Sequence, residues 1–424
     1  MNFMQVALDP GTALSPRPAY GFQPATPLQI ELIDDLTAAE PAWRALEAAP
    51  AVATAFQRFE WVAAWSRYVA TPEGLNFLIL LGTDASGAPQ FLLPFVYRPG
   101  ASLVVARFPG GQHSNINMGL WRGDAAGSLS GAQLTADLRT AARQRGIDLF
   151  LLLQQPPHWQ GLANPMALLP RQPTVDDVWG VTFPRGAGGD LLKAILTKSM
   201  RARLRNKVRK LEKLAGFRYL RATTPGEIDT LLDAFFEQKA AHFAEQGIRD
   251  VFADPHVSGF IRECCHTTST SGRAVIELHG ISCDDEVIAV MGGVSDARRF
   301  SCMFNSYTTG EAGRQSPGLV LLSRVVPSCA ERGLAGFDLG PGRAPYKTVF
   351  CREPEGLFDS IVAVSWRGHL AAPALRALRA TKRRVKANAA WQNLGPALRR
   401  RFGGHAASGC GAACGASTST TRSE

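Results

Sequence analysis

One stretch in the last third of the chain decides the fold: residues 314–350, RQSPGLVLLSRVVPSCAERGLAGFDLGPGRAPYKTVF. Ser316 is a favoured N-cap residue, and Pro317 fits the first helical position because no helix hydrogen bond is lost there. Apolar residues at helical spacing then predict a helix over 316–332. A short strand over 336–339 follows and ends in Gly-Pro-Gly. Open α/β sheets bind ligands where their strands end, so a ligand site is expected here.

The first turn of the helix over 316–332 is suited to a phosphate or a pyrophosphate. Its free N–H groups and the positive end of the helix dipole converge there. Gly318 allows another group to approach the backbone closely, and Arg314 adds positive charge just upstream. The residues alone also fit an ordinary capped helix after a loop, and both interpretations stay open.

The elements around this stretch occur twice in the same order. In the first half the patterns predict helices over 36–48 and 56–70, a hairpin over 75–82 and 90–98, a strand over 102–108, a helix over 130–145 and a strand over 147–153. In the second half they predict helices over 227–246 and 255–268, a hairpin over 273–282 and 286–294, and a strand over 299–309 before the helix over 316–332. A duplicated unit explains this order, so we expect an α/β (α+β) fold of two halves, each a mixed twisted sheet flanked by helices.

The predicted organisation has six parts along the chain. They are a loose leader over 1–26, an N-terminal half over 27–190, a basic connecting helix over 191–215, a C-terminal half over 216–368, basic C-terminal helices over 369–402 and a disordered tail over 403–424.

The composition is that of a globular protein, since 46% of the 424 residues are hydrophobic and 19% are charged. No apolar run approaches the roughly 20 residues that cross a bilayer, and the N-terminus lacks the features of a secretory signal. We therefore expect a cytoplasmic protein. Cysteines such as the adjacent Cys264 and Cys265 are predicted to be small buried side chains. Neither the pair Cys410 and Cys414 nor the scattered histidines have matching ligands, so no metal is expected.

The net charge of +10 comes from two segments. Residues 193–213 and residues 370–402 each carry an excess of Lys and Arg, and the rest of the chain is mildly acidic. For 193–213, a solvated helix and contact with an anionic acceptor or tRNA both stay open. Segment 370–402 alternates apolar and basic residues, which permits peripheral contact with a membrane surface. No aromatic interleaving indicates a nucleic-acid platform, and DNA is not an expected partner.

The sequence resembles a family of bacterial acyltransferases at three places. Residues 314–350 resemble the C-terminal signature of GNAT proteins often labelled cellulose biosynthesis protein CelD, in which SPG precedes a helix, FDLG follows it, and YK comes before an aromatic residue. KSMRARLRNKVRKLEK (198–213) resembles their basic helix, and FQRFEWVAAWSRY (56–68) resembles their Trp-containing N-terminal helix. These proteins are similar in layout to the FemAB peptidyltransferases, which also carry two GNAT-like halves. The label's link to cellulose and exopolysaccharide biosynthesis is a matter of naming.

The resemblance implies a tandem GNAT fold and acetyl-CoA or another acyl-CoA as co-substrate. The pyrophosphate would lie on the loop that enters the helix, and the pantetheine arm along the strand over 302–307. The residues implied in cofactor binding are Arg314, Gln315, Ser316, Gly318, Leu319, Met303 and Asn305. Val320 departs from the family pattern, which has a small residue there. FemAB relatives use a charged tRNA as donor, so the donor's identity stays open.

Acyl transfer needs an acceptor amine or hydroxyl that loses its proton. Asp338 is the first candidate base, with Glu277 and Glu311 behind it. Tyr346 or Tyr307 is expected to protonate the leaving thiolate. A backbone N–H on the strand over 302–307 is expected to polarise the thioester carbonyl.

The acceptor is expected to lie between the two halves. In the polar loop over 110–117, His113 and Asn115 are predicted to help hold it, and Lys347 could meet its phosphate or carboxylate. Three functions stay open: an acyl-CoA-dependent transferase acting on a saccharide, cell-envelope precursor or small amine, a FemAB-like aminoacyl or peptidyl transferase, and an inactive scaffold of exopolysaccharide assembly.

Overall fold

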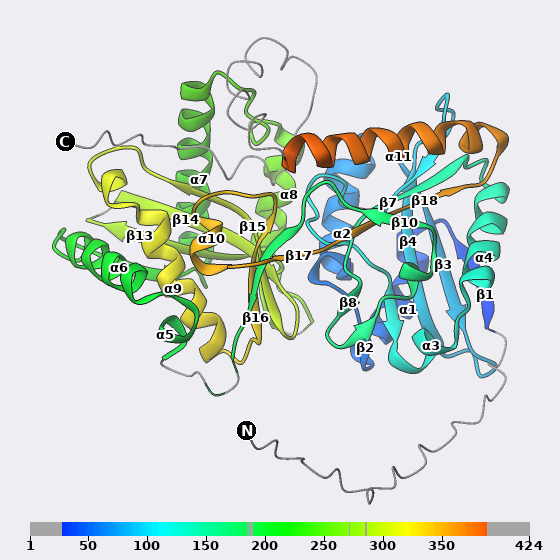
Figure 1. Ribbon diagram of the computed structural model, residues 1–424, viewed down its shortest axis with the longest axis horizontal. Helices are drawn as coiled ribbons and strands as arrows, with labels where there is room; N and C mark the ends of the chain where they lie inside the picture. Colours follow the sequence, from blue (N-terminus) through cyan, green and yellow to red (C-terminus); the bar gives the residue numbers. More distant parts are fainter. Residues whose placement is uncertain (1–27, 185, 187–189, 271, 285, 388–424) are drawn as a thin grey trace, which may run out of the picture.

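A computed structural model describes residues 28–387 of the chain, apart from residues 185, 187–189, 271 and 285. The predicted leader over 1–26, the predicted tail over 403–424 and residues 388–402 therefore lie outside the described residues. Figure 1 shows two bodies side by side, one from blue and teal segments and one from green and yellow segments. These bodies correspond to the two repeats expected from the order of elements.

The first body contains two main sheets with their helices. A five-stranded sheet has the order β1-β3-β4-β6-β2, and a four-stranded sheet has the order β10-β18-β7-β5. Their strands are β1 (Gln29–Ile33), β2 (Ala51–Val52), β3 (Asn76–Thr83), β4 (Pro89–Tyr97), β5 (Val105–Ala106), β6 (Leu120–Arg122), β7 (Leu149–Gln155), β10 (Arg171–Pro173) and β18 (Phe358–Ala363); β8 (His158–Trp159) and β9 (Leu162–Ala163) form a separate pair. The helices are α1 (Leu36–Ala48), α2 (Phe59–Trp65), α3 (Gly123–Ser128) and α4 (Gly131–Gln144).

The second body is built on one seven-stranded sheet of order β12-β13-β14-β15-β16-β11-β17. Its strands are β11 (Val178–Thr182), β12 (Arg218–Arg221), β13 (Glu277–Cys283), β14 (Glu286–Ser295), β15 (Arg299–Tyr307), β16 (Gly336–Pro341) and β17 (Pro354–Glu355). The helices are α5 (Leu191–Ile195), α6 (Lys198–Leu211), α7 (Pro225–Gln246), α8 (Pro255–His266), α9 (Pro317–Glu331) and the short α10 (Lys347–Phe350); α11 (Trp366–Ala387) follows β18 and lies on the first body. Helices α9 and α7 pack against the sheet, and α6 packs on α9.

The predicted hairpins are confirmed as β3–β4 and β13–β14, both antiparallel. Their strands are buried almost throughout because helices or further strands cover both faces, which explains their nearly continuous apolar runs. The predicted basic helix over 191–215 contains two helices, α5 and α6. The break falls at Leu196 and Thr197, and the Thr197 hydroxyl caps α6 by accepting from the Met200 N–H at 3.3 Å.

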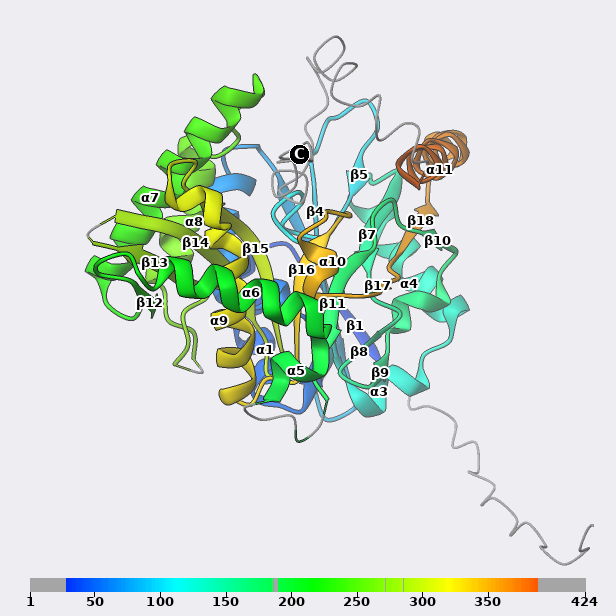
Figure 2. The same cartoon turned by 60° about the vertical axis from the view of Figure 1, so that its left-hand side comes forward.

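The two bodies exchange strands reciprocally. β11 precedes the second body in sequence but pairs antiparallel with β16 of its sheet. β18 follows the second body but pairs antiparallel with β7 in the first. In Figures 1 and 2, the segment from β17 to β18 crosses from one body to the other. The predicted boundaries at 190 and 368 stay a prediction, and each body contains a strand that comes from across them.

Side chains of both bodies pack together in one hydrophobic cluster. The rings of Trp61 on α2 and Phe260 on α8 lie 5.3 Å apart in an edge-on arrangement. Near them, Arg67 donates to Glu263 at 2.7 Å. A Cβ atom at Gly259 would lie 2.5 Å from the Tyr68 ring, so this glycine permits the close approach of α8 to the first body. The two bodies therefore share a packed interface.

The prediction that the scattered cysteines are small buried side chains is confirmed. Cys264, Cys265, Cys283, Cys302 and Cys329 are buried, and none of them forms a disulfide within the described residues. Burial raises the pKa of the Cys329 thiol to about 12. Cys410 and Cys414 lie outside the described residues.

Candidate functional site

Strands β15 and β16 separate near their middle. They pair in parallel from Arg299 and Gly336 to Ser301 and Asp338, and in the described chain their pairing ends there. The register between β15 and β14 also shifts at Gly292 and Gly293, so that Met303 is the extra residue of a bulge. The backbone of β15 beyond Ser301 is therefore turned away from its neighbour, and a ligand could lie along it.

A side chain from the first body reaches the point where these strands separate. The Asn115 amide, 4% exposed, donates to the Cys302 carbonyl at 2.8 Å. A Cβ atom at Gly340 would lie 2.8 Å from the same Asn115 nitrogen, and the φ of +71° at Gly340 also favours glycine. Asn115 was predicted to hold the acceptor. It lies between β15 and β16, and its acceptor role stays a prediction.

Asp338 is fully buried at the last position of β16 that pairs with β15. Its carboxylate accepts from the Ser301 hydroxyl at 2.6 Å and from the Gly340 N–H at 3.0 Å. Burial raises the pKa of Asp338 to about 6, although the Arg299 charge and these hydrogen bonds oppose the rise. The group can therefore exchange a proton near neutral pH, which a general base requires.

Arg299 and its partners were missed by the sequence analysis. The Arg299 guanidinium donates two hydrogen bonds to Glu355, at 2.7 and 2.8 Å, and lies 3.9 Å from the Asp338 carboxylate. It also stacks over the Trp159 ring of the first body at 5.0 Å. These residues come from distant segments, so no local pattern predicts their contact. The arginine fixes β17 beside the buried carboxylate.

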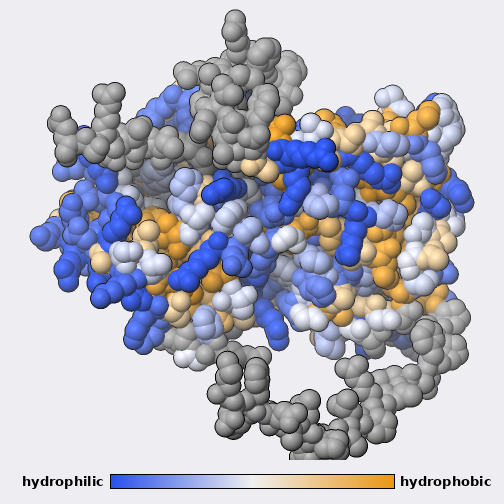
Figure 3. Space-filling model, viewed as in Figure 1, coloured by the Kyte–Doolittle hydropathy of each residue, from blue (hydrophilic) through white to orange (hydrophobic). Residues whose placement is uncertain are grey.

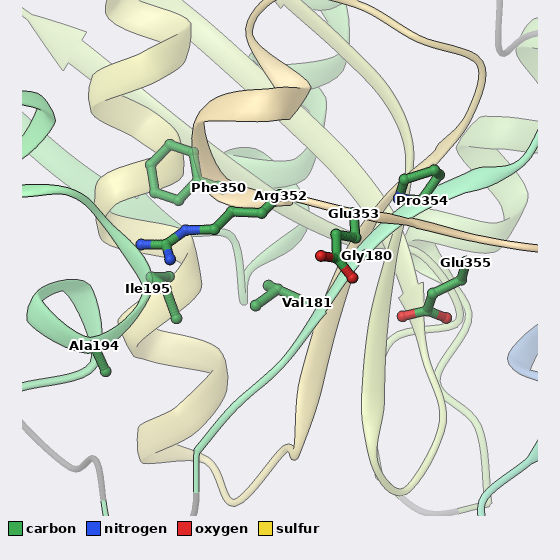
Figure 4. Close-up of a pocket in the computed structure, with 9 residues that line it drawn as sticks. All are labelled: Gly180, Val181, Ala194, Ile195, Phe350, Arg352, Glu353, Pro354 and Glu355. Carbon is green, nitrogen blue, oxygen red and sulfur yellow. The ribbon is translucent and has the colours of Figure 1, made fainter.

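A pocket of about 410 Å³ lies next to this network, between β11, α5 and the segment over 350–355. Figure 4 shows the side chains of Arg352 and Glu353 reaching over it. Its wall also includes Glu355, the partner of Arg299. None of the predicted site residues is among the described residues that line it.

The start of α9 agrees with the expectation in position but not in detail. Ser316 is the N-cap residue and Pro317 the first helical residue, as predicted. The expected side-chain cap is absent from the described structure, because the Ser316 backbone is left-handed, with a φ of 57° and a ψ of 59°, and its hydroxyl makes no capping hydrogen bond. The reason is the 3₁₀ turn over Ala312–Gln315, which ends with the Ser316 N–H donating to the Gly313 carbonyl. The Ser316 hydroxyl instead accepts from the Lys207 ammonium of α6 at 2.9 Å.

Positive charge surrounds the start of α9. Burial and the neighbouring charges of Arg203 and Lys210 lower the pKa of Lys207. Arg314 is exposed and Gln315 half-exposed in the turn that leads into the helix. Figure 3 shows a hydrophilic surface over α6 at the left of the molecule. A helix N-terminus with cations beside it attracts anions, so the geometry suits a phosphate.

Tyr307 lies at this helix start, away from Asp338. A Cβ atom at Gly318 would be 3.5 Å from the Tyr307 ring, and the His242 ring of α7 lies 6.4 Å from it. Tyr307 is six residues along β15 from Ser301, which corresponds to about 20 Å in a strand. Tyr307 and Asp338, both predicted as catalytic, are therefore at opposite ends of the open part of β15.

The other predicted residues lie in three places. Met303 is buried and Asn305 half-buried on β15, and Leu319 is half-buried in the first turn of α9. Tyr346 is half-buried before α10, and the buried Lys347 ammonium donates to the carbonyls of Gly340 and Pro341 at 3.3 and 2.8 Å. Lys347 therefore holds the end of β16.

His113 packs between aromatic residues of the two bodies. It accepts from the Trp65 indole at 3.2 Å, and its ring lies 5.7 Å from Phe260. Burial lowers the pKa of His113 to about 4, so the imidazole is neutral at pH 7. Its predicted contact with the acceptor stays a prediction.

Comparison with known proteins identifies the fold. Residues 198–348 match a family described as acetyltransferase (GNAT) domain. These residues include β15, β16, α6 and α9, which form the candidate site. No match is found among curated proteins. The enzyme class expected from the sequence, an acyltransferase, is confirmed by the domain match.

Two solved structures resemble most of the chain. The structure of FemX has a TM-score of 0.53 at 9% identity, and the likeness covers 78% of this chain and 96% of FemX. A conserved protein of unknown function from Bacteroides thetaiotaomicron VPI-5482 has a TM-score of 0.50 at 12% identity, covering 80% of this chain and all of the other. At such identities the likeness concerns the fold. The predicted α/β fold with two GNAT-like halves is confirmed.

Proposed function

We propose that the acyl donor of this acyltransferase is acetyl-CoA or another acyl-CoA, bound in the second body. The observation that carries the proposal is the Lys207 ammonium, held at Ser316 where α9 begins. The donor's pyrophosphate would accept a hydrogen bond from the Gly318 N–H in the first turn and attract Lys207 and Arg314. The Leu319 N–H already donates to the Ser316 carbonyl at 3.0 Å, so Leu319 would only border the pyrophosphate. Ser316 and Gln315 would border the same site.

The pantetheine arm would run along β15 where it leaves β16. Met303 and Asn305 are the residues of this strand proposed to contact it. A backbone N–H of the strand would stabilise the negative charge that develops on the thioester oxygen. The acceptor amine or hydroxyl attacks the thioester carbon, the carbon–sulfur bond breaks, and the CoA thiolate takes a proton from Tyr346. Tyr307 lies at the start of α9, beside the proposed pyrophosphate site, so its predicted role as the acid is not part of this proposal.

Asp338 is the proposed base for the acceptor's proton. Its carboxylate is enclosed by protein groups, so the proton would pass through the Ser301 hydroxyl that hydrogen-bonds to it. The pKa of about 6 lets the carboxylate accept that proton at neutral pH. Glu277 is engaged with Arg332, and Glu311 is exposed beside the 3₁₀ turn, which makes both second choices.

We propose as acceptor an amine or hydroxyl of a saccharide, a cell-envelope precursor or a small molecule, as the CelD-type resemblance suggests. Asn115, His113 and Lys347 are proposed to shape its side of the site. Asn115 has the most direct support because its side chain lies where β15 and β16 part. A reaction in the cytoplasm is part of this proposal.

A second candidate is aminoacyl or peptidyl transfer from a charged tRNA. The basic helix α6 favours it, because exposed cations along one helix attract a polyanion. The likeness to FemX is in line with it. An inactive scaffold is the third candidate.

Titration calorimetry with acetyl-CoA, CoA and unacylated tRNA separates these functions. The proposal expects acetyl-CoA to bind, and Lys207→Ala to weaken binding about tenfold to a hundredfold, because a charge-assisted hydrogen bond contributes about 1.5–3 kcal/mol. Arg209→Ala is the matched control: it is exposed on the same helix, about 200° around the axis from Lys207. Binding by tRNA alone would support the second candidate, and equal losses in both variants would contradict the assigned site.

A further inference from the structure

The outward face of α11 carries several exposed apolar side chains, although the helix lies on the outside of the molecule. Trp366 is 70% exposed, Leu370 72% and Leu378 51%. Ala374, Ala377 and Val385 are exposed too and share this stripe at helical spacing. Figure 1 shows α11 along the upper edge of the molecule, and Figure 2 shows it nearly end-on at the outside. Thr381 and Arg384 interrupt this stripe, but its exposed apolar side chains on one side of a helix still mark an interaction surface.

The inward face of α11 is held by cations that meet acidic or carbonyl partners. Arg379 donates to the fully buried Asp359 at 2.6 Å, and Arg383 pairs with Asp177 at 3.1 Å. Arg376 donates to the Ile361 carbonyl at 2.7 Å. These contacts fix which face of the helix points out.

The cations on the outer side differ from these. Arg367, Lys382 and Arg384 are exposed, and within the described part of the chain none of them forms an ion pair. Arg367 lies over the Trp366 ring at 5.6 Å. The helix contains no acidic residue, so these positive charges lie beside and within the apolar stripe without compensation from the helix itself. Figure 3 shows hydrophobic and hydrophilic patches alternating along this edge.

We infer that α11 docks the protein on an anionic lipid bilayer. The stripe would enter the headgroup boundary with Trp366 at the interface, and Arg367, Lys382 and Arg384 would meet lipid phosphates. A nucleic acid would pair with the cations but leave the stripe exposed. No helix of the described residues is long and apolar enough to cross a membrane, so this contact is at the surface. The inference does not depend on the identity of the acyl donor.

Sedimentation with vesicles of pure phosphatidylcholine and of phosphatidylcholine containing 30% phosphatidylglycerol tests this inference. We expect binding to the anionic vesicles that weakens with added salt. The variant Arg367→Gln/Lys382→Gln/Arg384→Gln should bind about a hundredfold more weakly, since each cation near such a surface contributes about fivefold. Trp366→Ala/Leu370→Ala should bind the anionic vesicles at least about tenfold more weakly than the wild type.

Two control variants match these changes elsewhere on the surface. Lys198→Gln/Arg205→Gln/Arg209→Gln removes the same charge from α6, and Leu168→Ala/Ile248→Ala removes exposed apolar side chains, 51% and 45% exposed. Both should bind vesicles like the wild type, and circular dichroism checks the folding of all four. If the α6 variant lost as much vesicle affinity as the α11 charge variant, the inference would be overturned. It would also be overturned by a dimer in light scattering that Trp366→Ala/Leu370→Ala dissociates while vesicle binding is unchanged.

Discussion

Replacing Asp338 by asparagine should change how the stability of this protein depends on pH. Burial raises the pKa of Asp338 from 3.8 to about 6 in the folded protein. One pKa unit corresponds to about 1.36 kcal/mol, so the shift is equivalent to about 3 kcal/mol. The side chain is fully buried, and solvent does not screen this effect.

The sign follows from the direction of the shift. Because the folded state binds the proton more tightly than the unfolded state, the carboxyl group stabilises the fold fully below about pH 4. This stabilisation is lost as the pH rises through about 6. An asparagine side chain at this position does not titrate. Between pH 4 and pH 7, the free energy of unfolding of Asp338→Asn should therefore rise by about 3 kcal/mol relative to that of the wild type.

Urea unfolding at pH 4, 5, 6 and 7, followed by circular dichroism, measures this difference. The asparagine also alters the hydrogen bonds to Ser301 and Gly340. Any resulting change in the free energy of unfolding that is the same at every pH cancels in the comparison between pH values. Asn115→Ala is the control, because it disturbs the same place without removing a titrating group. A difference between Asp338→Asn and the wild type that stays constant with pH would refute the reasoning.

Two further substitutions test the packing. Gly340→Ala should destabilise the protein more than Gly333→Ala, by at least about 1 kcal/mol in urea unfolding, because both have positive φ but only at Gly340 would the Cβ lie 2.8 Å from Asn115. Equal effects would mean that the clash relaxes. Arg379→Ala should lower the free energy of unfolding by about 3–5 kcal/mol, because it leaves the buried Asp359 charge without its ion-pair partner. Limited proteolysis should then cleave α11 sooner than in the wild type. Unchanged cleavage would contradict a role of this ion pair in holding α11 on the first body.

The sequence predicts the parts of this fold that depend on local pattern. The hairpins β3–β4 and β13–β14 follow from long apolar runs broken by turn residues. The helix over 316–332 follows from its spacing and from Pro317 at its start. These features involve residues near one another in the chain, and their partners are therefore visible in it.

The sequence does not predict contacts between distant segments. The strand exchange depends on β11 and β18, which are too short for their pattern to identify a partner. Arg299 meets Glu355 and Trp159 only through that exchange. At Ser316, the hydroxyl was expected to cap its own helix, but the preceding turn sets a left-handed backbone and Lys207 takes the hydroxyl. The one local signal for this network is Arg299, which begins the otherwise uncharged strand β15.

The exchange of β11 and β18 has a consequence for synthesis on the ribosome. The sheet around β7 lacks its inner strand until β18 emerges, roughly 200 residues after β7 itself. At about 5–20 residues per second, that interval is about 10–40 s. During it the apolar edge of β7 has no neighbour on that side, so the nascent chain should need a chaperone there longer than a chain whose first half closes by itself.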